Sequence, residues 1–146
     1  MSRTLFKGRP DDRLMQMYEA VRLTQEKSIS MIKEGADGKK IYEWSKTNLE
    51  SMGFPTDFKK EKPEGFFHGL GHGVGIDIHE PPSLCGTSAI LERGNVVTVE
   101  PGLYYSKSRG QIPIGGIRIE DMVLVGKNSC RNLTKMPKSL DWAVIP

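Results

Sequence analysis

The chain has 146 residues, which is room for one domain with its own hydrophobic core. Hydrophobic residues make up 37% and charged residues 27%, which is typical of a folded globular protein and not of a disordered one. The sequence lacks the long apolar run of a transmembrane helix, and its net charge of +3 is too small to indicate a nucleic-acid partner. Two cysteines, Cys85 and Cys130, cannot form a disulfide scaffold, so we expect free thiols and a cytoplasmic protein.

Two helices are predicted in the first third of the chain. A proline and two acids at residues 10–12 favour a helix start, and Gly35 ends this first helix just after Lys33. Apolar and small residues recur along it at steps of three and four, as on the buried side of a helix. These residues are Leu14, Met17, Val21, Thr24, Ser28, Met31 and Ile32. A second helix is predicted over residues 37–51, closed by Gly53.

The remainder of the chain has the texture of strands separated by turns. After residue 65, glycines become frequent and short β-branched runs appear at residues 96–99, 117–119 and 123–125. Residues 2–6 could form one more short strand. Helices followed by several strands predict an α+β fold with an antiparallel sheet. Neither an internal repeat nor a second domain is visible, so residues 1–146 are expected to belong to one domain.

All three histidines, His68, His72 and His79, fall within a short glycine-rich stretch. Its four glycines between residues 69 and 75 argue against a helix, because each glycine destabilises a helix by about 1 kcal/mol. We expect an extended segment, in which residues 68, 70 and 72 share a face and both histidines point the same way. Glycines at these positions would let the backbone approach a ligand or a metal closely.

Two carboxylates stand at the ends of apolar strands. Alternation places Val97 and Val99 on one face and Glu100 on the other, and it places Arg118 and Glu120 together. Taken singly, Glu100 is better explained as a solvated strand end, and the pair of Arg118 and Glu120 as a surface ion pair that contributes little. Together with one histidine the two acids form a set of hard ligands that suits Mn²⁺, Fe²⁺, Co²⁺ or Zn²⁺. Two such ions could serve a hydrolase.

Four ordered blocks resemble the signature of the Xaa-Pro dipeptidases (prolidases) and Xaa-Pro aminopeptidases, metallopeptidases with the pita-bread fold. The blocks are His68-Gly-Leu-Gly-His72-Gly-Val-Gly, Ile78-His79-Glu80-Pro81-Pro82, Thr98-Val-Glu100-Pro-Gly and Gly116-Ile-Arg118-Ile-Glu120-Asp121. The tail, Leu133-Thr134 followed by Pro137-Lys138, also resembles the end of that family. The resemblance covers nearly the whole chain. It implies the C-terminal half of a pita-bread domain, with two helices packed on a curved antiparallel sheet.

The resemblance also implies an activity and a cofactor. The reaction would be hydrolysis of the bond between an N-terminal residue and a following proline, so the implied partner is a proline-containing peptide. The family uses two divalent ions, usually manganese or cobalt, with zinc or iron as alternatives. His72, Glu100 and Glu120 match three of its five metal ligands, and Glu120 matches the bridging one. Glu100 is also placed to accept a proton in catalysis.

Further positions match residues of the family's substrate pocket. His79 matches the catalytic histidine that contacts both the substrate and the transition state. The two other matching positions are His68 and Arg118. The sequence leaves open whether dipeptides or longer peptides are cut.

The start of the chain departs from the family pattern. The family's other two ligands are aspartates, the second in a pattern like Asp-x-Ser/Thr-Arg-Thr, and this sequence begins Met1-Ser2-Arg3-Thr4. It therefore resembles that pattern from one residue after the aspartate, and both aspartates are expected to be missing. Asp11 and Asp12 are better explained as acids at a helix start.

Two hypotheses follow from this departure. In the first, the chain is a truncated and inactive form of a proline-specific metallopeptidase. In the second, it is a non-catalytic pita-bread relative, a binding module that has lost its metal site. In either case half a domain leaves an apolar sheet face uncovered, so a homo-oligomer is expected.

Overall fold

The computed structural model describes residues 1–59, 61–108, 110 and 112–146. Two long helices lead the chain, α1 over Asp12–Met31 and α2 over Gly38–Ser51. Each starts behind an aspartate that accepts a hydrogen bond from a backbone N–H of the first turn, at 2.8 Å for Asp11 and 2.9 Å for Asp37. Both predicted helices are confirmed, and these two acids act as caps.

The main sheet has five strands in the order β3-β2-β4-β7-β8, and all neighbouring pairs run antiparallel. Its strands are β2 (Gly71–Gly73), β3 (Glu80–Leu84), β4 (Val96–Val99), β7 (Asp121–Val125) and β8 (Cys130–Asn132). An antiparallel hairpin pairs β5 (Gly102–Tyr105) with β6 (Gly115–Arg118), and a parallel pair joins β1 (Phe6–Lys7) to β9 (Val144–Ile145). A one-turn helix, α3 (Leu140–Ala143), leads into β9.

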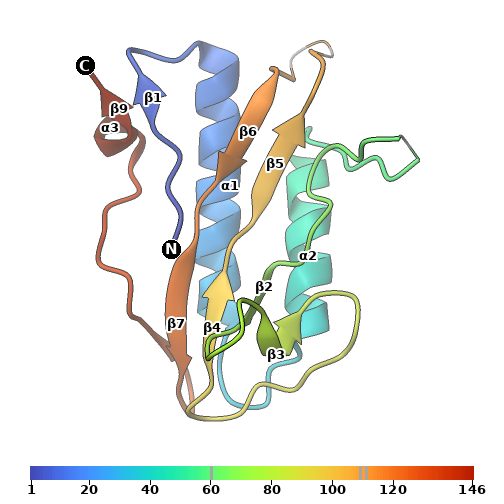
Figure 1. The fold of residues 1–146 in the computed structure, drawn as a ribbon, viewed down its shortest axis with the longest axis vertical. Helices are drawn as coiled ribbons and strands as arrows, with labels where there is room; N and C mark the ends of the chain where they lie inside the picture. Colours follow the sequence, from blue (N-terminus) through green and yellow to red (C-terminus); the bar gives the residue numbers. More distant parts are fainter. Residues whose placement is uncertain (60, 109, 111) are drawn as a thin grey trace.

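The long helices pack against one side of the strands, and in the described part of the chain no helix covers the other side (Figure 1). The core lies between these layers. Val97 and Val99 are fully buried there together with helix residues such as Tyr18 and Leu49. The alternation of β4 therefore directs Glu100 away from the core, as predicted from the sequence. The α+β class with an antiparallel sheet is confirmed.

The amino-terminal segment differs from its prediction. Residues 2–6 are not a strand, because Ser2 makes only an isolated bridge with Glu120 and β1 begins at Phe6. The partner of β1 is β9, at the other end of the chain. Among the described residues, none of the helices combines the length and the apolar character needed to cross a bilayer.

The glycine-rich stretch also differs in one respect from its prediction. Leu70 is fully buried in the core, whereas His68 and His72 line a pocket, so residues 68, 70 and 72 do not share one face. The strand β2 includes only Gly71–Gly73, and two-residue alternation therefore does not extend back to His68.

Candidate metal and active site

Three ligand-type side chains converge at the open side of the sheet. His72, Glu100 and Glu120 each offer one ligand atom, and these atoms lie within 4.8 Å of one another. The register of β4 and β7 explains why the two acids lie together. It pairs Val99 with Asp121, and so places Glu100 beside Glu120. A divalent ion binds nitrogen and oxygen ligands at about 2.0–2.2 Å, so ligand atoms about 4 Å apart can share one ion. The three ligand atoms could therefore bind one divalent cation after moving by less than about 1 Å.

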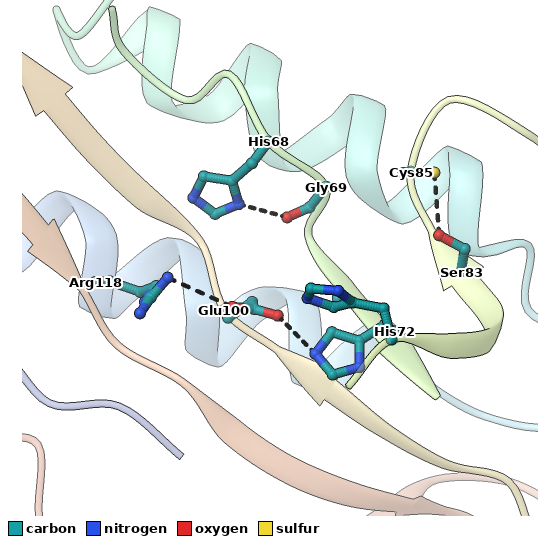
Figure 2. Close-up of a pocket in the computed structure, with 9 residues that line it drawn as sticks. His68, Gly69, His72, Ser83, Cys85, Glu100 and Arg118 are labelled. Carbon is teal, nitrogen blue, oxygen red and sulfur yellow. Dashed lines mark hydrogen bonds and ion pairs between the residues drawn. The ribbon is translucent and has the colours of Figure 1, made fainter. Parts of the chain in front are cut away.

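His72 presents its Nε2 to the two acids. Its Nδ1 lies 2.8 Å from the carbonyl oxygen of Gly73, which can only accept, so Nδ1 carries a hydrogen and Nε2 is the nitrogen available to a metal. Nε2 faces Glu100 Oε1 at 3.2 Å (Figure 2). A divalent cation between these two atoms would be bound by both, since an imidazole nitrogen and a carboxylate oxygen are metal ligands. The donor set thus favours a bound cation.

Backbone contacts hold this imidazole in place. The backbone N–H of His72 donates to Thr98 Oγ1 at 3.0 Å, and the Thr98 hydroxyl lies 3.1 Å from Glu100 Oε1. Gly73 pairs with Val97 across β2 and β4, which sets the histidine level with this threonine. One hydroxyl on β4 therefore orients both the histidine and the nearer acid.

Glu120 is ionised within a partly buried environment. Its Oε2 accepts a hydrogen bond from Ser2 Oγ at 2.5 Å, and its Oε1 lies 3.2 Å from the amino group of Met1. Burial alone would raise the pKa of Glu120, but these contacts and the nearby Arg118 together lower it below its ordinary value. The carboxylate is therefore held in the charged form that binds metal.

A pocket of about 370 Å³ opens beside this group. It is lined by His68, Gly69, Gly71, His72, His79, Ser83, Cys85, Glu100 and Arg118, most of which Figure 2 labels. The ring of His79 stands edge-on to that of His72, with centroids 4.4 Å apart. Glu100 lies between His72 and Arg118, whose Nη1 is 4.0 Å from Glu100 Oε2. Because the Arg118 side chain is 46% exposed, this ion pair is weak, and the guanidinium is accessible from the pocket.

His68 is a neutral acceptor at the edge of the pocket. Its Nδ1 lies 2.7 Å from the carbonyl oxygen of Gly69, and its ring packs edge-on against Phe66 at a centroid distance of 5.2 Å. Burial lowers the pKa of His68, and Arg118 lowers it further. Within the described part of the chain, its Nε2 is buried without a hydrogen-bond partner. A substrate N–H is the type of group that could satisfy it.

The pocket wall includes two residues that sequence reasoning missed. Ser83 donates to Cys85 Sγ at 3.0 Å, and this hydrogen bond is the main reason that the pKa of Cys85 is lowered. Both stand at the end of β3, a strand rich in proline that alternation did not predict. All six predicted site residues lie in the pocket or in the group of three ligand-type residues beside it.

The chain is similar to known proteins over most of its length. The sequence model of metallopeptidase family M24 matches residues 1–127, most of the chain. The chain belongs to this family. An Xaa-Pro dipeptidase of Pyrococcus horikoshii is 34% identical over 141 residues, which are 96% of this chain and 36% of the relative. An Xaa-Pro dipeptidase of Pyrococcus furiosus is 33% identical over the same length.

Solved structures of an Xaa-Pro dipeptidase and an X-Pro aminopeptidase resemble this chain. The Xaa-Pro dipeptidase from Bacillus anthracis superimposes with a TM-score of 0.82 at 35% identity, covering 98% of this chain and 36% of the other. The X-Pro aminopeptidase from Thermotoga maritima gives 0.81 at 30% identity. The resemblance and the pita-bread fold predicted from the sequence blocks are thus confirmed. The chain spans about a third of the length of these relatives.

Proposed function

We propose that this chain contributes to metal-dependent hydrolysis of peptide bonds next to proline. The observation that carries the proposal is the convergence of His72, Glu100 and Glu120 beside a pocket lined by His79 and Arg118. Xaa-Pro dipeptidases among the relatives support the choice of substrate. On this proposal residues 1–146 form the C-terminal portion of a metallopeptidase catalytic domain, which agrees with the share of the relatives that they span.

The three converging residues would hold the metal. Carboxylate and imidazole donors suit manganese or cobalt, with zinc or iron as the alternatives to test. A divalent ion bound there supplies a Lewis acid that stabilises negative charge on oxygen. The family resemblance implies two ions, whereas three ligand residues are sufficient for one. We therefore propose that the 146-residue chain by itself binds one ion weakly and has little activity.

The chain's own residues would act on the peptide as follows. Glu100 accepts a proton from the attacking water, because its carboxylate faces the pocket from the end of β4. His79 donates a hydrogen bond to the carbonyl oxygen of the scissile bond, and Arg118 binds a carbonyl or carboxylate of the peptide. His68 accepts a hydrogen bond through its buried Nε2. These roles need a peptide seated in the pocket beside all four side chains.

A non-catalytic module that has lost its metal site is the weaker proposal. Loss of function removes selection on the ligands, and such a module would have no reason to retain them. Here the three ligand-type residues remain together, and Glu120 is held in its charged form. We also propose a cytoplasmic location, because both cysteines are free thiols.

The test measures metal binding and proline release in parallel. Titration calorimetry with Mn²⁺ is carried out on the wild-type chain, on Glu120→Gln, and on Glu92→Gln as a matched control at an exposed acid. Release of proline from an Xaa-Pro dipeptide is then measured with and without the upstream segment of an Xaa-Pro dipeptidase relative, added as a fusion. We expect weak Mn²⁺ binding that Glu120→Gln abolishes, and proline release only with the added segment. Equal Mn²⁺ binding by wild type and Glu120→Gln would overturn the site.

A further inference from the structure

A buried polar cluster lies directly behind the candidate metal ligands. At its centre is Asp121, which follows Glu120 in the chain and is only 1% exposed. Asp121 Oδ1 accepts a hydrogen bond from Arg3 Nη2 at 2.6 Å. Its Oδ2 accepts from Asn132 Nδ2 at 2.7 Å and from Lys138 Nζ at 2.9 Å. The amino-terminal segment, β8 and the carboxy-terminal tail therefore meet at one carboxylate of β7.

Lys138 joins this carboxylate to helix α1. Its ammonium also donates to Gln25 Oε1 at 2.6 Å, and its side chain is 18% exposed. Gln25 is fully buried, and its Nε2 lies 3.4 Å from the backbone carbonyl oxygen of Val99. One charged group from the C-terminal tail thus bridges α1 and β7, and reaches β4 through Gln25.

The residues bonded in this cluster are sequence neighbours of both acidic ligands. Val99 immediately precedes Glu100, and Asp121 immediately follows Glu120. Val99 and Asp121 are paired in the β4–β7 register. Arg3 adds a hydrogen bond from its Nη1 to the backbone carbonyl oxygen of Glu120 at 2.7 Å. The cluster therefore holds the backbone of β4 and β7 from the core side. The two carboxylates project from the same strands to the opposite side.

Stability alone is a poor reason for such a cluster. Buried charged groups lose their hydration, and replacing a buried ion pair by apolar residues of similar volume is often neutral or stabilising. Geometry gives a better reason, because metal ligands must be held within about 0.5 Å of their productive positions. The cluster also accounts for the lysine of the Pro137-Lys138 tail, to which the proposed chemistry assigns no part.

We propose that Lys138 is a positioning residue that sets the spacing of Glu100 and Glu120 through Gln25 and Asp121. The inference rests on the proposed metal site and adds to it a dependence on the C-terminal tail. Residues that orient metal ligands typically change metal affinity by about 10- to 100-fold when they are replaced. Lys138→Met leaves Asp121 paired with Arg3, so the fold is retained while the link to α1 is lost.

The experiment compares Mn²⁺ affinity among variants of the 146-residue chain by titration calorimetry. We expect Lys138→Met to weaken binding by about tenfold or more. Lys138→Arg keeps the charge and the donors, and we expect it to recover most of that loss. The matched control is Lys135→Met, which removes an exposed lysine from the same tail and leaves affinity unchanged. Ile41→Val, a mild change in the core of α2, shows whether lowered stability by itself affects binding.

A second readout needs no metal. The amide NMR resonances of Glu100 and Glu120 are expected to move in metal-free Lys138→Met and to stay in place in Lys135→Met. If the wild-type chain and His72→Ala bind Mn²⁺ equally, the proposed metal site fails, and the amide resonances still test the positioning. If the wild type binds through His72 while Lys138→Met binds within twofold of it, the positioning role is overturned. The positioning role is also overturned if Lys138→Met lowers the Mn²⁺ affinity no more than Ile41→Val does at the same loss of stability.

Discussion

Gly71 shows how a single residue type determines where the candidate metal ligand lies. A Cβ at this position would lie 1.9 Å from the backbone carbonyl oxygen of Thr98, on the neighbouring strand. Glycine has no Cβ, so β2 can approach β4 closely enough for the His72 amide to bond with Thr98 Oγ1. The glycines around the histidines therefore serve close packing of two strands, as well as the turn that follows them.

We predict that Gly71→Ala destabilises the fold and displaces His72. Relief of the clash requires β2 to move away from β4, and overpacking of this kind typically lowers the free energy of unfolding by about 1–3 kcal/mol. The matched control is Gly86→Ala, because a Cβ at Gly86 would meet no heavy atom within 4 Å. Urea denaturation measures stability, and Mn²⁺ titration reports on His72. Equal stability of the two variants would contradict the close approach.

At the scale of the element, the pairing of β4 with β7 governs the site. It sets Val99 opposite Asp121, buries Val97 and Val123, and leaves the flanking glutamates side by side on the open face. A slip of one residue would turn every side chain of one strand to the wrong face. The buried contacts of Asp121 oppose such a slip, because a displaced carboxylate would lose its three bonded partners.

We predict that Asp121 contributes to stability in a pH-dependent manner. Burial would raise its pKa, but hydrogen bonds from Lys138, Asn132 and Arg3 lower the pKa below its ordinary value. A carboxyl group whose pKa is lowered by folding stabilises the fold fully above its unfolded pKa of about 3.9. This contribution is lost as the pH falls through the lower folded value. The stabilisation is therefore present at neutral pH and disappears in acid.

The measurement is urea denaturation of the wild type and Asp121→Asn at pH 7 and at about pH 3. At pH 7 we expect the variant to be less stable by about 3 kcal/mol, since it leaves buried cations without their partner. The difference in the free energy of unfolding between the two proteins is expected to become smaller in acid, where the wild-type carboxylate takes up a proton. A difference of constant size at both pH values would show that the charge of Asp121 is not the cause.

At the scale of the whole molecule, the uncovered side of the sheet carries an apolar loop beside the pocket. Val74, Ile76 and Ile78 are 44%, 101% and 83% exposed. The loop is held by the carboxylate of Glu80, whose Oε1 accepts from the backbone N–H groups of Ile76 and Asp77 at 2.7 and 2.9 Å. Isoleucines presented to water by a fixed loop favour association, which supports the homo-oligomer expected from the uncovered sheet face.

We predict that the chain self-associates through this loop. Sedimentation of the wild type is expected to give an average mass that rises with concentration. The double variant Ile76→Asp/Ile78→Asp is expected to remain monomeric at the same concentrations, because like charges would replace the apolar contact. Ile90→Asp is the control, since Ile90 is 57% exposed outside this loop. A wild type that is monomeric throughout, or variants that associate equally, would contradict the prediction.

Short-range patterns in the sequence were sufficient for much of this protein. Steps of three and four predicted α1 and α2, because residues that far apart lie on one side of a helix. Alternation predicted that Glu100 faces away from the core, because side chains change face at each residue of a strand. The sequence blocks around His72 and Glu120 predicted the family, which the comparisons confirmed.

Tertiary structure decided the features that depend on contacts between distant residues. Sequence alone did not predict the parallel pairing of β1 with β9, the burial of Leu70 between two pocket histidines, or the bridge from Lys138 to Gln25. Periodicity reports only on residues within about one helical turn or a few strand positions of each other. The β1–β9 pair and the Lys138–Gln25 bridge join opposite ends of the chain, and all three features are selected by how the layers pack and by which buried polar groups find partners. The identity of the candidate ligands was therefore readable from the sequence, whereas the way they are held in place depends on the folded chain.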